Sequence, residues 1–325
     1  MNSLFLNNQV IVYIFSETIL ALLTLVIFVM ALKFIRYWDF NSFSSFQLKL
    51  EKEANLVMTI ATFLFTLKLL LLIYFVYTID NLSLIVPGAM CGAGVISAND
   101  YGMTLLFVKI TVIFGLLLFL VANHYDLLGK NYPLFRFKSW VIVITALLIF
   151  GEFYLDISYF TNIDTSVPVS CCSALFGNLE GANPLPFGLD IKMLLVLFFT
   201  LYFGVAVALY LESRLLSTLL LALFGVIAYY SVVYFFGTYV YELPTHKCPF
   251  CMLQKEYNYI GYLIWGSLFF GLYFGFIWVI MSLRSYKLGR IKLASILLLT
   301  LFIAINSFYV TNYYLHNGVL LEGIK

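Results

Sequence analysis

The chain has few charged residues for its length. Lysine, arginine, aspartate and glutamate make up 10% of its 325 residues, whereas soluble domains carry about 25%. Hydrophobic residues make up 63% and the mean hydropathy is +1.00, so a water-soluble fold could not bury so much apolar surface. The lipid bilayer is therefore the expected partner, and the net charge of +2 gives no reason to expect nucleic acid.

The sequence also lacks the motifs of common catalytic sites. It has no phosphate-binding loop, no nucleophile elbow, no dinucleotide-binding fingerprint and no His-Glu-x-x-His metal motif. Its N-terminus shows no charged region followed by a small-residue cleavage site, so we expect no removable signal peptide. Cysteines and a few charges within apolar segments remain as the residues able to carry chemistry.

Long apolar runs dominate the sequence. Transmembrane barrels alternate apolar and polar residues in segments of about 10, but here the runs are continuous and roughly 20 residues long, enough to cross the bilayer as helices. We predict an all-α fold, a polytopic transmembrane helix bundle that forms a single integral membrane domain over residues 1–325. The predicted spans are 9–36, 54–79, 103–123, 139–160, 189–211, 215–241, 258–283 and 293–313.

Basic residues are concentrated in every second loop between the predicted spans. Most of them follow the odd-numbered spans, as Lys49, Lys130 and Arg290 do, whereas the opposite loops hold Lys247 and Lys255. Because cytoplasmic loops carry the excess of basic residues, both termini and all the cysteine loops should face outside. The predicted location is a bacterial-type inner or plasma membrane with an N-out/C-out topology.

Five cysteines lie in three of the predicted outer loops. They are Cys91, the adjacent Cys171 and Cys172, and Cys248 with Cys251 in Cys-Pro-Phe-Cys. In each loop a proline precedes one cysteine by four residues, which suggests that three hairpins deliver thiols to one place. We expect Cys248 at the N-terminus of the seventh helix, where the helix dipole stabilises a thiolate, and Cys251 one turn deeper as its resolving partner.

The stretch Cys248-Pro-Phe-Cys251-Met-Leu-Gln-Lys255 resembles the Cys-x-x-Cys stretch of DsbB-type membrane disulfide oxidoreductases. It is also similar to the cysteine pair that opens a helix in the vitamin K epoxide reductase family. The resemblance covers about residues 244–260. It implies thiol–disulfide exchange at the outer membrane face and a bound quinone near Lys255.

The cysteines leave three functional hypotheses open. The first is a thiol–disulfide oxidoreductase that serves a periplasmic thiol protein. The second is a protein that takes a soft metal such as copper from a carrier protein, because a disulfide between adjacent cysteines is strained and paired thiolates suit soft ions. The third is a structural subunit with disulfide-stapled loops. The candidate metal ligands are Met90, Cys91, Cys171, Cys172, His246, Cys248, Cys251 and Met252.

Charged residues inside the predicted spans are the second candidate site. We predict that Lys68, Lys109, Glu152 and Asp156 face the bundle interior, because a charge at the bilayer centre costs about 2.5–3.5 kcal/mol. Glu152 and Asp156 lie one helical turn apart, so their repulsion keeps one protonated unless a lysine lies between them. A polar pocket here would move protons during thiol oxidation. Structural ion pairing or lysine snorkelling is the alternative.

Overall fold

The computed structural model describes residues 7–40, 42, 44–89, 91–129, 132–166, 168–169, 188–244, 246–283 and 288–321. Over this part of the chain all regular elements are helices, and eight of them are long and apolar enough to cross a membrane. The predicted all-α transmembrane fold is therefore confirmed, and the N-out/C-out orientation stays a prediction. The chain divides into two compact units, Met1–Val169 and Ser170–Lys325, and the single-domain assignment stays untested.

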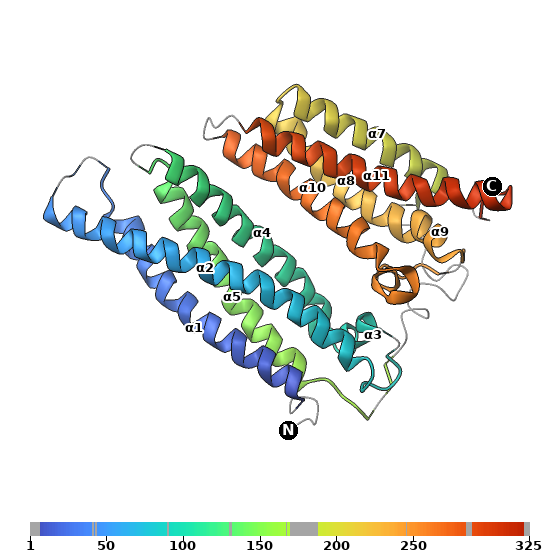
Figure 1. The fold of residues 1–325 in the computed structure, drawn as a ribbon, viewed down its shortest axis with the longest axis horizontal. Helices are drawn as coiled ribbons and strands as arrows, with labels where there is room; N and C mark the ends of the chain where they lie inside the picture. The colour runs from blue at the N-terminus through green and yellow to red at the C-terminus, as the bar shows by residue number, and fades with distance from the viewer. Residues whose placement is uncertain are drawn as a thin grey trace. The chain divides into compact units, whose positions relative to one another are not determined.

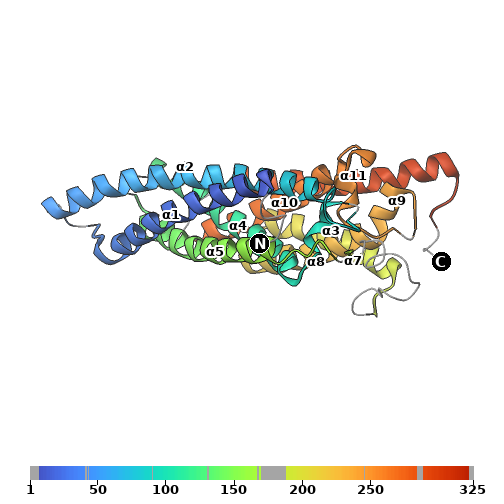
Figure 2. The same cartoon turned by 90° about the horizontal axis from the view of Figure 1, so that it is seen from below.

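Unit 1 is built on four long helices that run side by side (Figures 1 and 2). α1 packs against both α2 and α5, and α4 packs against α5. Asn and Ser side chains cap the starts of α1, α2 and α4 by accepting a hydrogen bond from the first-turn backbone. The helices of unit 1 are α1 Asn8–Tyr37, α2 Ser45–Leu82, α3 Gly92–Ile96, α4 Asp100–Leu128 and α5 Phe135–Thr161.

Two apolar clusters fill the interior of unit 1. One gathers around Phe34, Phe65 and Phe119, and the other around Phe75 and Phe160 at the end where α3 lies. Aromatic edges and faces meet within both, with Phe65 and Phe119 ring centroids 5.1 Å apart. The charged residues described below lie between these two clusters.

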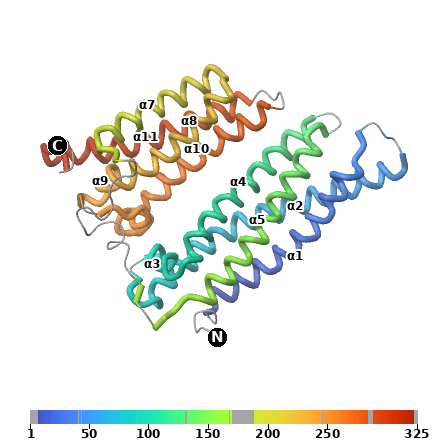
Figure 3. Tube along the Cα trace, turned by 180° about the vertical axis from the view of Figure 1, so that it is seen from behind, coloured from blue at the N-terminus to red at the C-terminus, as the bar shows by residue number. Residues whose placement is uncertain are grey.

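Unit 2 contains the remaining long helices (Figure 3). α8 continues through the π-helical turn η3 into α9, so that Arg214–Tyr241 forms one span. α8 also packs against α7 and α10, and α10 packs against α11. The helices of unit 2 are α7 Ile191–Tyr210, α8 Arg214–Ser231, η3 Val232–Phe236, α9 Gly237–Tyr241, η4 Cys251–Leu253, η5 Lys255–Tyr257, α10 Ile260–Ser282 and α11 Gly289–Asn317.

The predicted spans agree with these helices to within a few residues at most ends. The clearest difference is α2, which begins at Ser45 rather than at residue 54. Its first turns are polar, and hydropathy detects only the part of a helix that crosses hydrocarbon. The helix itself continues because Ser44 caps it and accepts a hydrogen bond from the backbone N–H of Gln47.

A glycine lets α10 and α11 approach each other closely. A Cβ atom on Gly271 would lie 2.6 Å from Leu299 Cδ2 and 2.9 Å from its Cγ. The Ser295 hydroxyl donates a hydrogen bond across the same contact to the Gly271 carbonyl at 2.7 Å. Small residues of this kind allow the close backbone approach on which helix packing in membranes depends.

We predict that Gly271→Leu lowers the free energy of unfolding by about 1–3 kcal/mol, since an added side chain overpacks the α10–α11 contact. The matched control is Gly266→Leu in the same helix, where nothing lies within 4 Å of the added Cβ. That control should keep wild-type stability or gain slightly, because leucine is the better helix former. Thermal unfolding in lipid nanodiscs measures both, and equal stability of the two variants would contradict the packing.

Candidate functional sites

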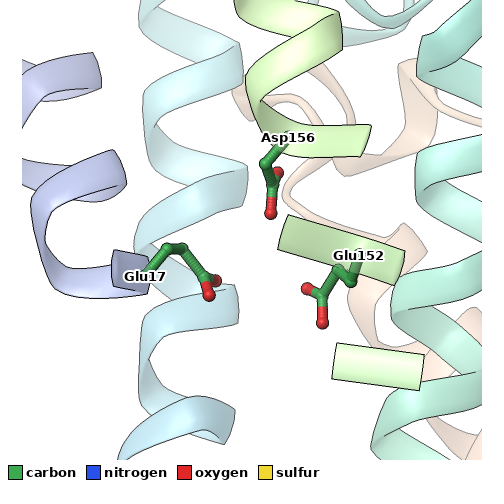
Figure 4. A group of neighbouring side chains, drawn as sticks. All are labelled: Glu17, Glu152 and Asp156. Atoms are coloured by element: carbon green, nitrogen blue, oxygen red, sulfur yellow. The ribbon is translucent and has the colours of Figure 1, made fainter. Parts of the chain in front are cut away.

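Six polar side chains meet inside unit 1 between the two apolar clusters. Each of the six is at most 4% exposed. Figure 4 shows the three carboxylates turned toward one another, Glu17 from α1 and the other two from α5. We call this group the polar cluster; its members are Tyr13, Glu17, Lys68, Lys109, Glu152 and Asp156.

The Lys109 ammonium lies at the centre of the polar cluster. Its Nζ is 2.6 Å from Glu152 Oε1 and 3.0 Å from Asp156 Oδ2. It also donates a hydrogen bond of 2.6 Å to the Tyr13 hydroxyl, so all three of its protons have acceptors. The Phe75 ring centroid lies 4.4 Å from the same nitrogen, close enough for a cation–π contact.

Lys68 makes the second bridge of the polar cluster. Its ammonium pairs with Glu17 and lies 3.1 Å from Glu152 Oε2. Glu152 therefore lies between both lysines, and Lys109 lies between the two carboxylates of α5. The prediction that these charges face the bundle interior agrees with their burial, and snorkelling toward a membrane surface is excluded for these two lysines because their heads are buried.

The polar cluster contains an arrangement that resembles a metal site. Among the described residues, one trio of His, Cys, Asp or Glu has ligand atoms within 4.8 Å of one another, and it is Glu17, Glu152 and Asp156. The two lysine ammonium groups pair with these carboxylates, as given above. A metal ion would have to displace both ammonium groups, so we assign the trio to ion pairing rather than to metal binding.

A small cavity adjoins the polar cluster. Its volume is about 10 Å³, and Glu17, Lys68, Lys109 and Glu152 form its polar wall. That volume is close to the minimum for a single water molecule. The other lining residues are apolar: Leu72, Val112, Ile113 and Leu116.

Tyr13 was not among the site residues predicted from the sequence. The signal was its position four residues before Glu17, which places both on one face of α1. Tyrosine is so common in this chain that one of its 24 copies does not stand out. Its hydroxyl is nevertheless the one group of the polar cluster that contacts both Glu17 and Asp156.

A second buried ion pair joins α4 to α5. Lys138 Nζ lies 2.6 Å from Asp126 Oδ2 and donates to Asn123 Oδ1 at 2.9 Å. The other Asp126 oxygen accepts a 2.6 Å hydrogen bond from the backbone N–H of Leu134. Lys138 is only 2% exposed, and the pair fastens the turn between the two helices.

The described cysteines are divided between the two units. Cys91 is buried in unit 1, in the N-cap position of α3. Cys248 and Cys251 belong to unit 2, where Cys248 is 1% exposed and Cys251 is partly exposed. Cys171 and Cys172, and the proposed ligand Met90, lie outside the described residues. The expected meeting of all five thiols therefore stays a prediction.

Aromatic side chains hold the Cys-Pro-Phe-Cys segment in place. The Tyr241 hydroxyl donates a hydrogen bond to the Cys248 carbonyl and accepts one of 3.1 Å from the backbone N–H of Met252. The indole N–H of Trp265 donates to the Pro249 carbonyl at 2.9 Å. The backbone of the motif is thereby fixed to α9 on one side and to α10 on the other.

The expectation that Cys248 lies at the N-terminus of the seventh span is wrong. That helix, α10, begins at Ile260, because Asn258 and Tyr259 have φ values of 52° and 57° and stop a helix from extending backwards. Cys248 is therefore not part of the first turn of α10. Cys251 is the more exposed of the two thiols, and its expected position one turn deeper stays a prediction.

The backbone of unit 1 ties the Cys91 loop to the segment that leads to Cys171. The N–H of Val169 donates a 2.9 Å hydrogen bond to the Pro87 carbonyl. Gly88 permits this approach, because its φ is +79° and a Cβ there would lie 2.5 Å from the Val169 carbonyl oxygen. Val169, two residues before Cys171 in the sequence, therefore lies beside Pro87, four residues before Cys91.

The remaining predicted ligands are placed as follows. Met252 is fully buried and packs against Gly261, where an added Cβ would lie 2.6 Å from its Cγ. The His246 ring packs on Tyr241 at a centroid distance of 4.3 Å. Lys255, the residue that the resemblance places near quinone, is exposed in η5.

Comparison of the chain with protein-family models, with curated proteins and with solved structures finds no match. The similarity of residues 244–260 to DsbB-type oxidoreductases therefore rests on the motif alone. Any functional argument has to come from the residues themselves.

We predict that Lys109→Met lowers the free energy of unfolding by about 3–5 kcal/mol, because it leaves Glu152 and Asp156 buried without their shared ammonium. The matched control is Lys192→Met in α7, whose side chain is exposed and which should change stability by less than about 0.5 kcal/mol. Thermal unfolding of both purified variants in nanodiscs measures the difference. Similar midpoints would show that the polar cluster contributes little to stability.

Proposed function

We propose that the protein is a membrane thiol–disulfide oxidoreductase that acts at the outer face of a bacterial-type inner membrane. The observation that carries the proposal is the fixed geometry of Cys-Pro-Phe-Cys, held by Tyr241 and Trp265 with one thiol buried and the other accessible. Exchange with a partner requires one sulfur that the partner can reach and a second sulfur that leaves when the mixed disulfide forms. The partly exposed Cys251 suits the contact with the partner, and the buried Cys248 suits the second role.

We base the proposed roles of the two cysteines on their exposures. A thiolate of a periplasmic dithiol protein attacks Cys251 of the oxidised pair, forms a mixed disulfide and releases Cys248 as a thiolate. The second thiol of the partner then attacks its own sulfur in the mixed disulfide and releases Cys251. The partner loses two electrons and two protons and becomes a disulfide, while the pair gains them and becomes a dithiol.

Cys91, Cys171 and Cys172 form the second half of the proposed relay. The hydrogen bond between Val169 and Pro87 supports it, because Val169 lies two residues before Cys171 and Pro87 four residues before Cys91 in the sequence. Reoxidation of the dithiols requires an acceptor of two electrons and two protons. We propose a quinone, which leaves as quinol, with the exposed Lys255 four residues beyond Cys251 as the hydrogen-bond donor to a quinone carbonyl.

Soft-metal binding is the second candidate function. The observation that favours it is His246, whose Nε2 is buried and receives no hydrogen bond from the described residues. His246 lies two residues before Cys248 in the chain. Copper ions can be coordinated by imidazole and thiolate ligands at the same site. Metal analysis of protein purified under reducing conditions distinguishes the two candidates, because the oxidoreductase should hold no stoichiometric copper.

We predict that Cys248→Ser accumulates a mixed disulfide between Cys251 and a partner protein. The Cys251 thiolate can still attack the disulfide of the oxidised partner, whereas the thiol whose attack on Cys251 would release the reduced partner is gone. Acid trapping of native membranes followed by non-reducing electrophoresis should show a shifted band that reductant removes. Cys251→Ser should give little of this band, and the double serine variant should give none. A band in Cys251→Ser alone would contradict the assigned roles, and no band in any variant would contradict the oxidoreductase.

A further inference from the structure

The polar cluster contains more negative than positive groups. Three carboxylates, Glu17, Glu152 and Asp156, are buried with the two ammonium groups of Lys68 and Lys109. If all five were ionised, the sum of three negative and two positive charges would leave one uncompensated negative charge inside a transmembrane bundle. An isolated charge there is strongly unfavourable, so the cluster requires one further positive charge.

The contacts of the Tyr13 hydroxyl indicate where that charge lies. Its oxygen is 3.0 Å from Glu17 Oε1 and 3.1 Å from each carboxylate oxygen of Asp156. A phenol has a single proton and can donate to only one of these carboxylates. If the other carboxylate is protonated, it donates to the phenol oxygen, and both short contacts of Tyr13 are then hydrogen bonds.

We propose that the polar cluster binds one proton, shared by Glu17 and Asp156 through the hydroxyl of Tyr13. In one state Asp156 is the acid and donates to the Tyr13 oxygen, while the Tyr13 O–H donates to Glu17. In the other state Glu17 is the acid, and the Tyr13 O–H donates to Asp156. The two states interconvert when the carboxylic proton moves to the phenol oxygen and the phenol proton moves to the opposite carboxylate, so no proton is gained or lost.

The groups around Tyr13 keep both states available. Lys109 donates to the phenol oxygen in either state, since the contact involves its own proton. Glu17 keeps its contact with Lys68, and Asp156 keeps its contact with Lys109. From α5, the Tyr159 hydroxyl is engaged with the Val95 carbonyl at 2.8 Å and does not enter the cluster.

A proton fits the site better than a metal cation does. The lysine ammonium groups already bridge the carboxylates, and the adjoining cavity of about 10 Å³ has room for at most a water molecule. A proton adds no volume and needs no set of oxygen ligands. The shared proton involves none of the cysteines, so its test is independent of the proposed thiol chemistry.

Infrared spectroscopy of the protein in nanodiscs tests the proposal directly. At neutral pH the wild type should show a carboxylic-acid C=O band that shifts in D₂O. Glu17→Gln and Asp156→Asn should each abolish this band while keeping nearly wild-type thermal stability, because each amide replaces the neutral acid. Tyr13→Phe should keep the band at a changed frequency, since the charge count is unaltered but the bridging hydroxyl is gone.

Two further variants separate the shared proton from general destabilisation. Glu17→Gln combined with Asp156→Asn leaves an excess positive charge and should lower the unfolding temperature well below that of either single variant. Glu152→Gln should also be destabilising by itself, because Glu152 bridges both lysines. A wild type without the band, a band that survives both single variants, or stability that requires added sodium or potassium would overturn the proposal.

Discussion

The structure of unit 1 depends on the cost of placing a charge in hydrocarbon. Each ionisable group of the polar cluster is buried, and each reaches groups of opposite charge on other helices. Because no single helix supplies both signs in balance, the four helices have to associate before any of them is neutral. The same requirement fixes their register, since Lys68 and Lys109 must lie level with Glu17, Glu152 and Asp156.

Much of this organisation could be predicted from the sequence. The spans follow from continuous hydropathy, and the inward orientation of Lys68, Lys109, Glu152 and Asp156 follows from the penalty for facing lipid. The pairing of particular residues could not be predicted, because it depends on how far each helix is shifted along its neighbours. Tyr13 was missed for a different reason: a tyrosine in an apolar helix carries no charge that would distinguish it from the other tyrosines.

The local structure of the Cys-Pro-Phe-Cys segment could be predicted less well than the charged residues of unit 1. Hydropathy places a helix after Cys251, but the start of α10 is decided by the left-handed backbone of Asn258 and Tyr259, which a hydropathy pattern does not contain. The aromatic frame from Tyr241 and Trp265 joins residues from separate spans and is equally invisible to local motifs. The Cys-Pro-Phe-Cys motif suggested thiol–disulfide exchange, and the structure adds that Cys251 is the more exposed of its two thiols.

The central claim is that the buried charges of unit 1 act as one balanced network. A comparison of Lys68→Met with the double variant Lys68→Met/Glu17→Gln tests it most directly, with the unfolding free energy of both measured in nanodiscs. The account predicts that the second substitution restores at least about 1 kcal/mol, because it removes a carboxylate that has lost its ammonium. If the two substitutions instead destabilise additively, the residues do not share one charge balance and the account is wrong.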